Sequence, residues 1–239
     1  MLAPNSPIRL VAGLGNPDRE YLRTRHNAGF WFADALARKL SRTFSMEKKF
    51  FGEVCRLDGD VWMVKPMTFM NRSGQAVAAL AGFYQIKPEE ILIVHDELDL
   101  RPGEVKLKMG GGVAGHNGLK DIRDRLGTAD FWRLRIGIGH PRELALSEQE
   151  VVDYVLHRPG EEHQKLIEST IDKCIGVWPA LSKGEMERAM HQLHTKPKPP
   201  KPPKPAASDP AAPGDQPAKT PAPAPGPVAR DEPKPTENS

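Results

Sequence analysis

Cysteine, long apolar runs and an excess of either charge are all scarce in this sequence of 239 residues. Its two cysteines, Cys55 and Cys174, form no C-x-x-C pair and no zinc-finger spacing, which argues against a disulfide scaffold and a thiolate metal site and fits a reducing compartment. No stretch approaches the roughly 18 uncharged apolar residues that a membrane span needs, and residues 1–6 lack the basic-then-apolar order of a signal peptide. These absences predict a soluble, cytoplasmic protein.

Proline is concentrated at one end of the chain, because 15 of the 24 prolines fall in residues 197–239. Lys-Pro and Ala-Pro repeats with almost no large apolar residues cannot offset their ordering entropy by burial. We therefore expect a folded catalytic domain over residues 1–195 and a disordered Pro/Ala/Lys-rich tail over residues 196–239. Residues 1–196 carry 28 Lys and Arg against 26 Asp and Glu. Any contact with RNA must then be a local patch rather than a global field.

Apolar periodicity alternates between that of strands and that of helices along the folded part. Strands are expected at 8–13, 52–57, 60–65, 91–94, 104–109 and 133–138. Helices are expected from just after His26 to Leu40 and at 73–84, 115–126, 147–156, 161–182 and 185–194. Asp58-Gly59 suits a tight hairpin turn between two of the strands. The pattern predicts a single α/β domain with a twisted, mostly parallel mixed central sheet flanked by helices, and a ligand site outside the carboxyl ends of the strands.

The glycines Gly13 and Gly15 after the first strand do not complete a dinucleotide-binding fingerprint. Asp18 stands at the third glycine position, Pro17 interrupts the turn, and no acidic residue closes a second strand about 20 positions on. Two interpretations stay open: the glycines only permit a tight turn, or the turn presents Asn16 to a ligand.

Polar side chains recur where the predicted strands run into helices. They are Asn16, His26, Asn71, His95, Asp96, His116 and Asn117. Each alone has a structural explanation, since Asn is common in turns and helix caps and His can occupy a satisfied core position. The chain has no G-x-S-x-G elbow, no plausible Cys-His pair, no P-loop and no H-E-x-x-H motif. A histidine with a carboxylate and several amides suits general-base hydrolysis of an activated ester.

Five sequence motifs, which include these polar residues, resemble those of a known protein family. They are Gly13-Leu14-Gly15-Asn16-Pro17, Thr24-Arg25-His26-Asn27-Ala28-Gly29-Phe30, Lys65-Pro66-Met67-Thr68-Phe69-Met70-Asn71-Arg72-Ser73-Gly74, His95-Asp96-Glu97-Leu98-Asp99 and Gly115-His116-Asn117-Gly118-Leu119-Lys120. In order and spacing they resemble the bacterial peptidyl-tRNA hydrolase family over about residues 8–190. The resemblance implies hydrolysis of the ester between a peptide and the 3′ ribose of tRNA, by a monomer that needs no metal and no cofactor.

The resemblance also implies a role for individual positions. His26 matches the catalytic base and Asp96 the carboxylate that orients it, whereas Asn16, Asn71 and Asn117 match residues that bind the peptide and position the water or oxyanion. Lys108 and Arg135, with Lys106 nearby, match a clamp for the 5′ phosphate of tRNA, which Lys and Arg bind by charge-assisted hydrogen bonds. Tyr21, Phe69, Met70 and His116 match further positions around the cleft, although Phe69 and Met70 could equally pack in the core.

Two departures and two rival functions remain. Val113 stands where many relatives have histidine, so one polar contact of the glycine-rich loop is expected to be missing, and the tail is an addition.

One rival function is that of an RNA-binding module on the same fold that does not catalyse. The intact His26 and Asp96 argue against this rival. The other is a metallohydrolase that uses His26, His95, His116 and Asp96 with Asp99. A chelator distinguishes this metalloenzyme from a general-base enzyme.

Overall fold

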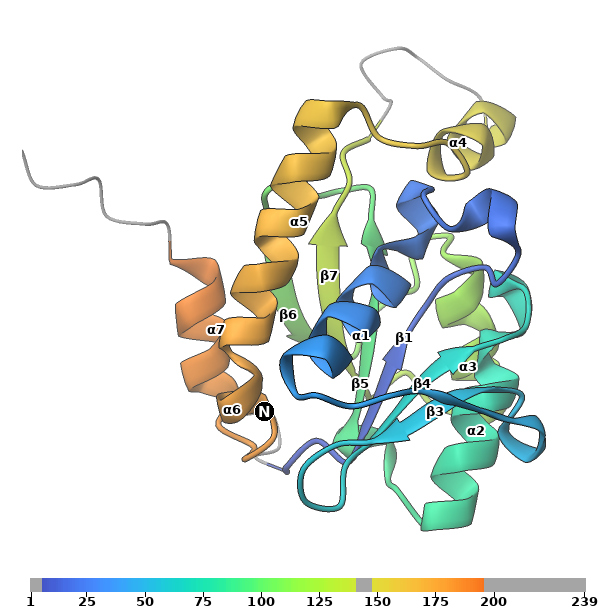
Figure 1. Ribbon diagram of the computed structural model, residues 1–239, viewed down its shortest axis with the longest axis vertical. Coiled ribbons are helices and arrows are strands. Elements are labelled where there is room, and N and C mark those ends of the chain that lie inside the picture. The colour runs from blue at the N-terminus through green and yellow to red at the C-terminus, as the bar shows by residue number, and fades with distance from the viewer. Residues whose placement is uncertain (1–5, 141–147, 196–239) are drawn as a thin grey trace, which may run out of the picture. The chain divides into compact units, whose positions relative to one another are not determined.

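The computed structural model describes residues 6–140 and 148–195 (Figure 1). The strands are β1 Leu10–Gly13, β2 Ser45–Glu47, β3 Gly52–Arg56, β4 Trp62–Pro66, β5 Ile91–Glu97, β6 Val105–Met109 and β7 Trp132–Gly137. The α-helices are α1 Ala28–Lys39, α2 Ser73–Tyr84, α3 Asn117–Leu126, α4 Glu148–Val155, α5 Glu161–Gly176, α6 Trp178–Leu181 and α7 Met186–His194. Short 3-10 helices are η1 Arg19–Tyr21, η2 Arg25–Asn27, η3 Lys48–Phe50, η4 Met70–Arg72 and η5 Pro88–Glu90.

The strands form one mixed sheet in the order β2-β3-β4-β1-β5-β7-β6. The four central strands β4, β1, β5 and β7 pair in parallel, whereas β2, β3 and β6 join through antiparallel pairs. Only β3 and β6 therefore run against the others. This arrangement confirms the predicted single α/β domain with a mixed, mostly parallel sheet.

Helices cover both faces of this sheet because successive side chains of a strand point to opposite sides. On β5, Leu92 and Val94 join a core with α1, α5, α6 and α7, whereas Ile91 and Ile93 join a second core with α2 and α3. Figure 1 shows the first group of helices on the near side of the sheet and α2 and α3 behind it. The result is a three-layer domain whose parallel strands all end at one edge.

The glycines after β1 allow close approach and do not adopt a special turn conformation. Neither Gly13 nor Gly15 has a positive φ. A Cβ on Gly13 would lie 2.3 Å from the backbone oxygen of Gly29, and one on Gly15 would lie 2.7 Å from the ring of Phe30. Helix α1 can therefore rest directly on the end of β1, and this contact brings η2, with His26, to the carboxyl edge of the sheet.

Strand β5 is longer than expected, since it continues through His95, Asp96 and Glu97 instead of ending at Val94. Parallel pairing with β7 reaches from Leu92 to Glu97. All three polar residues are buried, with exposed fractions of 1%, 3% and 6%. Apolar periodicity could not predict this extension, because here the buried strand carries polar side chains that find polar partners.

Other boundaries differ for local reasons. The helix expected at 161–182 is interrupted at Val177, because Pro179 has no N–H to donate and its ring crowds the preceding turn. The hairpin at Asp58-Gly59 exists, but β3 and β4 are joined by residues 57–61 rather than by a two-residue turn. Strand β2 was not predicted, and its three residues carry no alternating apolar pattern.

The tail expected over residues 196–239 lies outside the described residues. In the described ranges, no helix combines the length and apolar character that crossing a bilayer requires.

Candidate active site

A cleft of about 680 Å³ opens where the parallel strands β4, β1 and β5 end. Its polar walls come from four segments, the turn after β1, η2, η4 and the start of α3, together with β5, β6 and β7. The lining includes Asn16, His26, Phe69, Met70, Asn71, Asp96, Glu97, Leu98, Lys108, Val113, His116, Asn117, Arg133 and Arg135. The cleft therefore lies at the edge where the strand order places ligand sites in α/β sheets.

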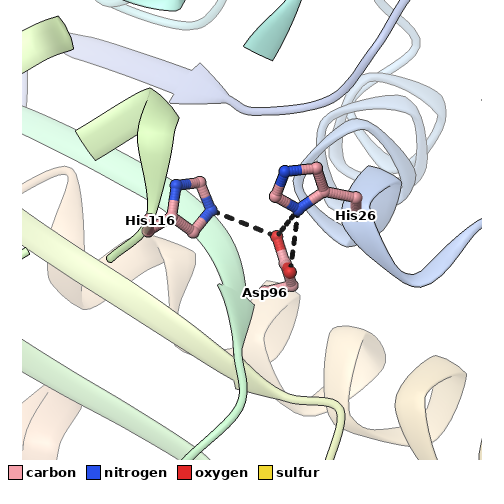
Figure 2. A group of neighbouring side chains, drawn as sticks. All are labelled: His26, Asp96 and His116. Carbon is pink, nitrogen blue, oxygen red and sulfur yellow. Dashed lines mark hydrogen bonds and ion pairs between the residues drawn. The ribbon is translucent and has the colours of Figure 1, made fainter. Parts of the chain in front are cut away.

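His26 and Asp96 meet in this cleft although 70 residues separate them in the chain. Nδ1 of His26 lies 3.0 Å from each carboxylate oxygen of Asp96. An ionised carboxylate only accepts hydrogen bonds, so Nδ1 carries the proton and Nε2 keeps its lone pair. Figure 2 shows Nε2 on the side of the ring away from Asp96. His26 thus holds the tautomer that a general base needs.

The surroundings of the pair favour this charge state. Burial alone would raise the pKa of the Asp96 carboxyl, but the charge of His26 and the hydrogen bonds from His116 and His26 hold that pKa well below its usual range. Burial lowers the pKa of His26, whereas the charge of Asp96 and the hydrogen bond to it raise that pKa, and the net pKa lies above its ordinary value. Asp96 is therefore ionised, and it stabilises the imidazolium that forms when His26 takes up a proton.

A second imidazole contacts the same carboxylate. Nε2 of His116 lies 3.2 Å from Oδ1 of Asp96, as drawn in Figure 2. Nδ1 of His116 accepts a hydrogen bond of 3.4 Å from the backbone N–H of Leu119 and so caps the N-terminus of α3. His95 packs against His116, with the two ring centroids 4.9 Å apart in an edge-to-face arrangement. Burial lowers the pKa of His95 well below its ordinary value, so this histidine is neutral.

Asn16 lines the cleft, and hydrogen bonds hold both its side chain and its backbone. Its side-chain oxygen accepts from the N–H of Met70 at 2.7 Å, so Nδ2 is the remaining donor of the amide. The backbone N–H and C=O of Asn16 both bond to the side-chain amide of Asn27, each at 2.9 Å. Asn27 is fully buried and was missed by the sequence analysis, although it directly follows His26. Asn71 and Asn117, by contrast, are exposed residues of the lining.

The far end of the cleft is basic. Lys106 pairs with Arg135 and Lys108 with Arg133 across β6 and β7, and side chains in such positions share one face of a sheet. Nε of Arg135 donates to Glu97 at 2.8 Å. The buried Arg133 donates to the carbonyl oxygens of Gly110 and Gly112, and so holds the glycine-rich loop that follows Lys108.

Helix α4 supplies an apolar wall opposite the polar one. Three side chains of α4 and the side chain that follows the helix line the cleft: Val151, Val152, Val155 and Leu156. The end of this helix is tied to the neighbour of the base, because Nη1 of the buried Arg25 lies 3.1 Å from the carbonyl oxygens of Tyr154, His157 and Arg158. The guanidinium of Arg25 also stacks on the ring of Tyr154 at 4.0 Å. No pattern in the sequence predicts this link.

Comparison with known proteins agrees with this geometry. A family model described as peptidyl-tRNA hydrolase matches residues 10–201. This chain belongs to the peptidyl-tRNA hydrolase family. A peptidyl-tRNA hydrolase of Bordetella avium is 58% identical over 196 residues, which cover 81% of this chain and 94% of the relative. One of Neisseria gonorrhoeae is 58% identical over 195 residues, 80% of this chain and 100% of the relative. The crystal structure of peptidyl-tRNA hydrolase from Acinetobacter baumannii superposes with a TM-score of 0.74 at 46% identity, covering 78% of this chain and 94% of that one.

Most positions that the family resemblance singled out lie together in this member of the peptidyl-tRNA hydrolase family. His26, Asp96, His116, Asn16, Asn71, Asn117, Phe69, Met70, Lys108 and Arg135 all line the cleft. Tyr21 and Lys106 lie outside the lining. Met70 is 4% exposed and belongs to the core, whereas Phe69 is 55% exposed. Val113, at the position where the family resemblance implies histidine in many relatives, also lines the cleft.

The metal alternative can be examined through its ligand atoms. Among the described residues, His26, Asp96 and His116 form a group whose nitrogen and oxygen atoms lie within 4.8 Å of one another. Nδ1 of His26 and Nε2 of His116 both hydrogen-bond to the Asp96 carboxylate. Nε2 of His116 carries a proton because Nδ1 accepts from a backbone N–H, and a protonated nitrogen cannot bind a metal. His95 and Asp99, the other two candidates, do not line the cleft.

Proposed function

We propose that this chain hydrolyses peptidyl-tRNA, so that the ester between the peptide and the 3′ ribose is cleaved and tRNA and peptide are released. The observation that carries the proposal is the bond from His26 Nδ1 to Asp96 in a cleft that is also lined by three asparagines and by Lys108 and Arg135. Membership of the peptidyl-tRNA hydrolase family supports it. The reaction belongs to translation, where it recycles tRNA, and we expect it in the cytoplasm.

His26 acts as the general base. Its Nε2 accepts a proton from a water molecule while the water oxygen attacks the ester carbonyl carbon. The carboxylate of Asp96 stabilises the imidazolium that forms, in the manner known from catalytic triads. The bond between the carbonyl carbon and the 3′ oxygen then breaks, and the proton passes from His26 to the leaving ribose oxygen. No covalent intermediate with the protein is needed.

The amides supply the electrostatic part of catalysis. Nδ2 of Asn16 is directed by the bond of its oxygen to the N–H of Met70. Donors that are fixed before the reaction stabilise a developing oxyanion without reorganisation. Asn71 and Asn117 can donate to the peptide backbone without adding charge. The apolar wall of α4 and the exposed Phe69 are suited to the side chains of the peptide.

The basic end of the cleft binds the tRNA. Lys108 and Arg135 contact the 5′ phosphate at the acceptor end, and Lys106 on the same face contributes from outside the lining. Because Glu97 holds Nε of Arg135, the phosphate contact uses the two Nη groups. All these groups come from one chain, and we expect the protein to act as a monomer.

The test is the release of a labelled acyl-peptide from tRNA by the purified protein with a chelator present. We expect full turnover with the chelator, and His26→Ala should lower kcat by about 10²–10⁴ while the affinity for tRNA changes little. His163→Ala, in an exposed position of α5, is the matched control and should behave as wild type. Loss of turnover with the chelator would favour the metalloenzyme. Binding of tRNA without turnover would favour the RNA-binding module.

A further inference from the structure

His116 uses both of its ring nitrogens, and the two partners determine where its proton lies. A backbone N–H can only donate, so Nδ1 of His116 must accept from Leu119. In a neutral imidazole the other nitrogen then carries the hydrogen. Nε2–H of His116 therefore donates to Oδ1 of Asp96 across 3.2 Å.

We propose that His116 is a positioning residue, which holds the carboxylate of Asp96 for His26 and is itself fixed by the N-terminus of α3. This role rests on the proposed hydrolysis and differs from the substrate contact that the family resemblance implies for His116. With both nitrogens engaged inside the protein, the ring offers a substrate only its carbon atoms.

The packing around His116 supports a fixed ring. Its centroid lies 5.1 Å from that of His26 and 4.9 Å from that of His95. His95 cannot turn, because its Nδ1–H donates to the backbone oxygen of Asp96 at 2.6 Å. The ring of His116 thus packs against two other imidazoles, and its one donor points at the carboxylate (Figure 2).

The consequence for the base is electrostatic as well as geometric. Asp96 receives donors from His26 on η2 and from His116 at the N-cap of α3, and the neutral His95 precedes it on β5. On the neighbouring strand β7, the charge of Arg133 acts on His95. A donor from His116 takes up part of the negative charge of Asp96. Without it, the full charge would act on the imidazolium of His26, and the base would stay protonated to higher pH.

Two substitutions separate the two bonds of His116. Asn can place an acceptor where Nδ1 lies and is a preferred N-cap residue, but it is too short to reach Asp96. Gln can place its amide near the position of Nε2, but it loses the cap. We expect His116→Asn to keep the melting temperature, to lower kcat by about ten- to a hundredfold and to move the acid limb of the pH profile to higher pH. His116→Gln should stay closer to wild type in kcat and melt about 2–4 °C lower.

Nuclear magnetic resonance of the imidazole nitrogens gives a readout that does not depend on turnover, and the wild-type protein alone suffices to measure the tautomer of His116. In the wild-type protein we expect His116 to be protonated at Nε2 only, and the measured pKa of His26 should rise in His116→Asn. A proton on Nδ1 of His116 would overturn the proposal, as would wild-type kcat and pH profile in His116→Asn. A rise in KM alone in both variants would overturn it in favour of a substrate contact. Wild-type protein that does not hydrolyse peptidyl-tRNA would refute the proposed function instead, and the tautomer would still be measurable.

Discussion

Asp96→Asn changes one charge in the cleft and almost no volume, and it should disable the reaction. In the wild-type protein the carboxylate accepts from two imidazole N–H groups, those of His26 and His116. The amide of Asn has a single acceptor oxygen, so its NH₂ group must face one of the two donors. Nδ1 of His26 lies 3.0 Å from both oxygens of Asp96, so the NH₂ group faces this ring in either orientation and favours the tautomer with the proton on Nε2. The base then has no lone pair toward the water.

The size of the expected loss in kcat follows from the distance between His26 and Asp96. Unit charges 3.0 Å apart, the separation of His26 Nδ1 from each oxygen of Asp96, attract by about 5.5 kcal/mol at an effective dielectric constant of about 20. An amide dipole recovers only part of this energy. The imidazolium that forms in the transition state should therefore be destabilised enough to lower kcat by about 10³–10⁴, since each 1.36 kcal/mol is about tenfold.

Single-turnover release of acyl-peptide from labelled tRNA measures this change directly. Without the carboxylate, burial is left to lower the pKa of His26, so the acid limb of the residual activity should move to lower pH. Asp99→Asn, three residues further on and outside the lining, is the matched control and should keep wild-type turnover. A kcat for Asp96→Asn within threefold of wild type, with an unchanged pH profile, would refute the reasoning about the pair.

Five further substitutions test three other parts of the structure. Lys108→Ala and Arg135→Ala should each raise KM by about tenfold on substrates with a 5′ phosphate; an equal rise on substrates that lack it would contradict the clamp. Arg25→Ala removes the donor shared by three carbonyl oxygens at the end of α4, and should lower the free energy of unfolding by about 2–4 kcal/mol in urea titrations; an unchanged midpoint would show that this link carries no stability. Gly29→Ala would put a Cβ 2.3 Å from the backbone nitrogen of Leu14 and from the backbone oxygen of Val94 and should cost about 3 kcal/mol or more, whereas Gly82→Ala, with open space around it in α2, should stabilise by up to about 1 kcal/mol. Equal melting temperatures for these two glycine variants would be the contrary result.

Periodicity in the sequence was sufficient for the architecture, because most of the sheet and helices bury apolar stripes. Strand β5 shows where it fails. Its first four residues are apolar and were predicted, whereas the last three are polar and buried, and only their partners on η2, α3 and β7 explain why they remain in a strand. Such partners are distant in sequence, so no local pattern contains them.

For the site, residue types and motifs identified which side chains matter, but not how they are connected. Nothing local to His26 and Asp96 gives their distance, which depends on the contact between Gly13 and Gly29. The protonated nitrogen of each ring depends on partners such as the N–H of Leu119. Arg25 reads as one more basic residue in the sequence, and only the position of α4 reveals what it binds. The catalytic and binding roles assigned to the side chains of the site, those of His26 and Asp96 included, stay predictions.

Asp96 and Glu97 are consecutive residues of one buried strand, and each holds a different working side chain: His26 in one case, Arg135 in the other. In the proposed binding mode, the residues that cleave the ester and bind the phosphate are therefore both positioned by the same strand. A strand cannot lengthen, so the distance between the site of cleavage and the phosphate contact is constant. A site of this kind would recognise tRNA by the distance between its 3′ ester and its 5′ phosphate and not by its bases, and would therefore accept every tRNA.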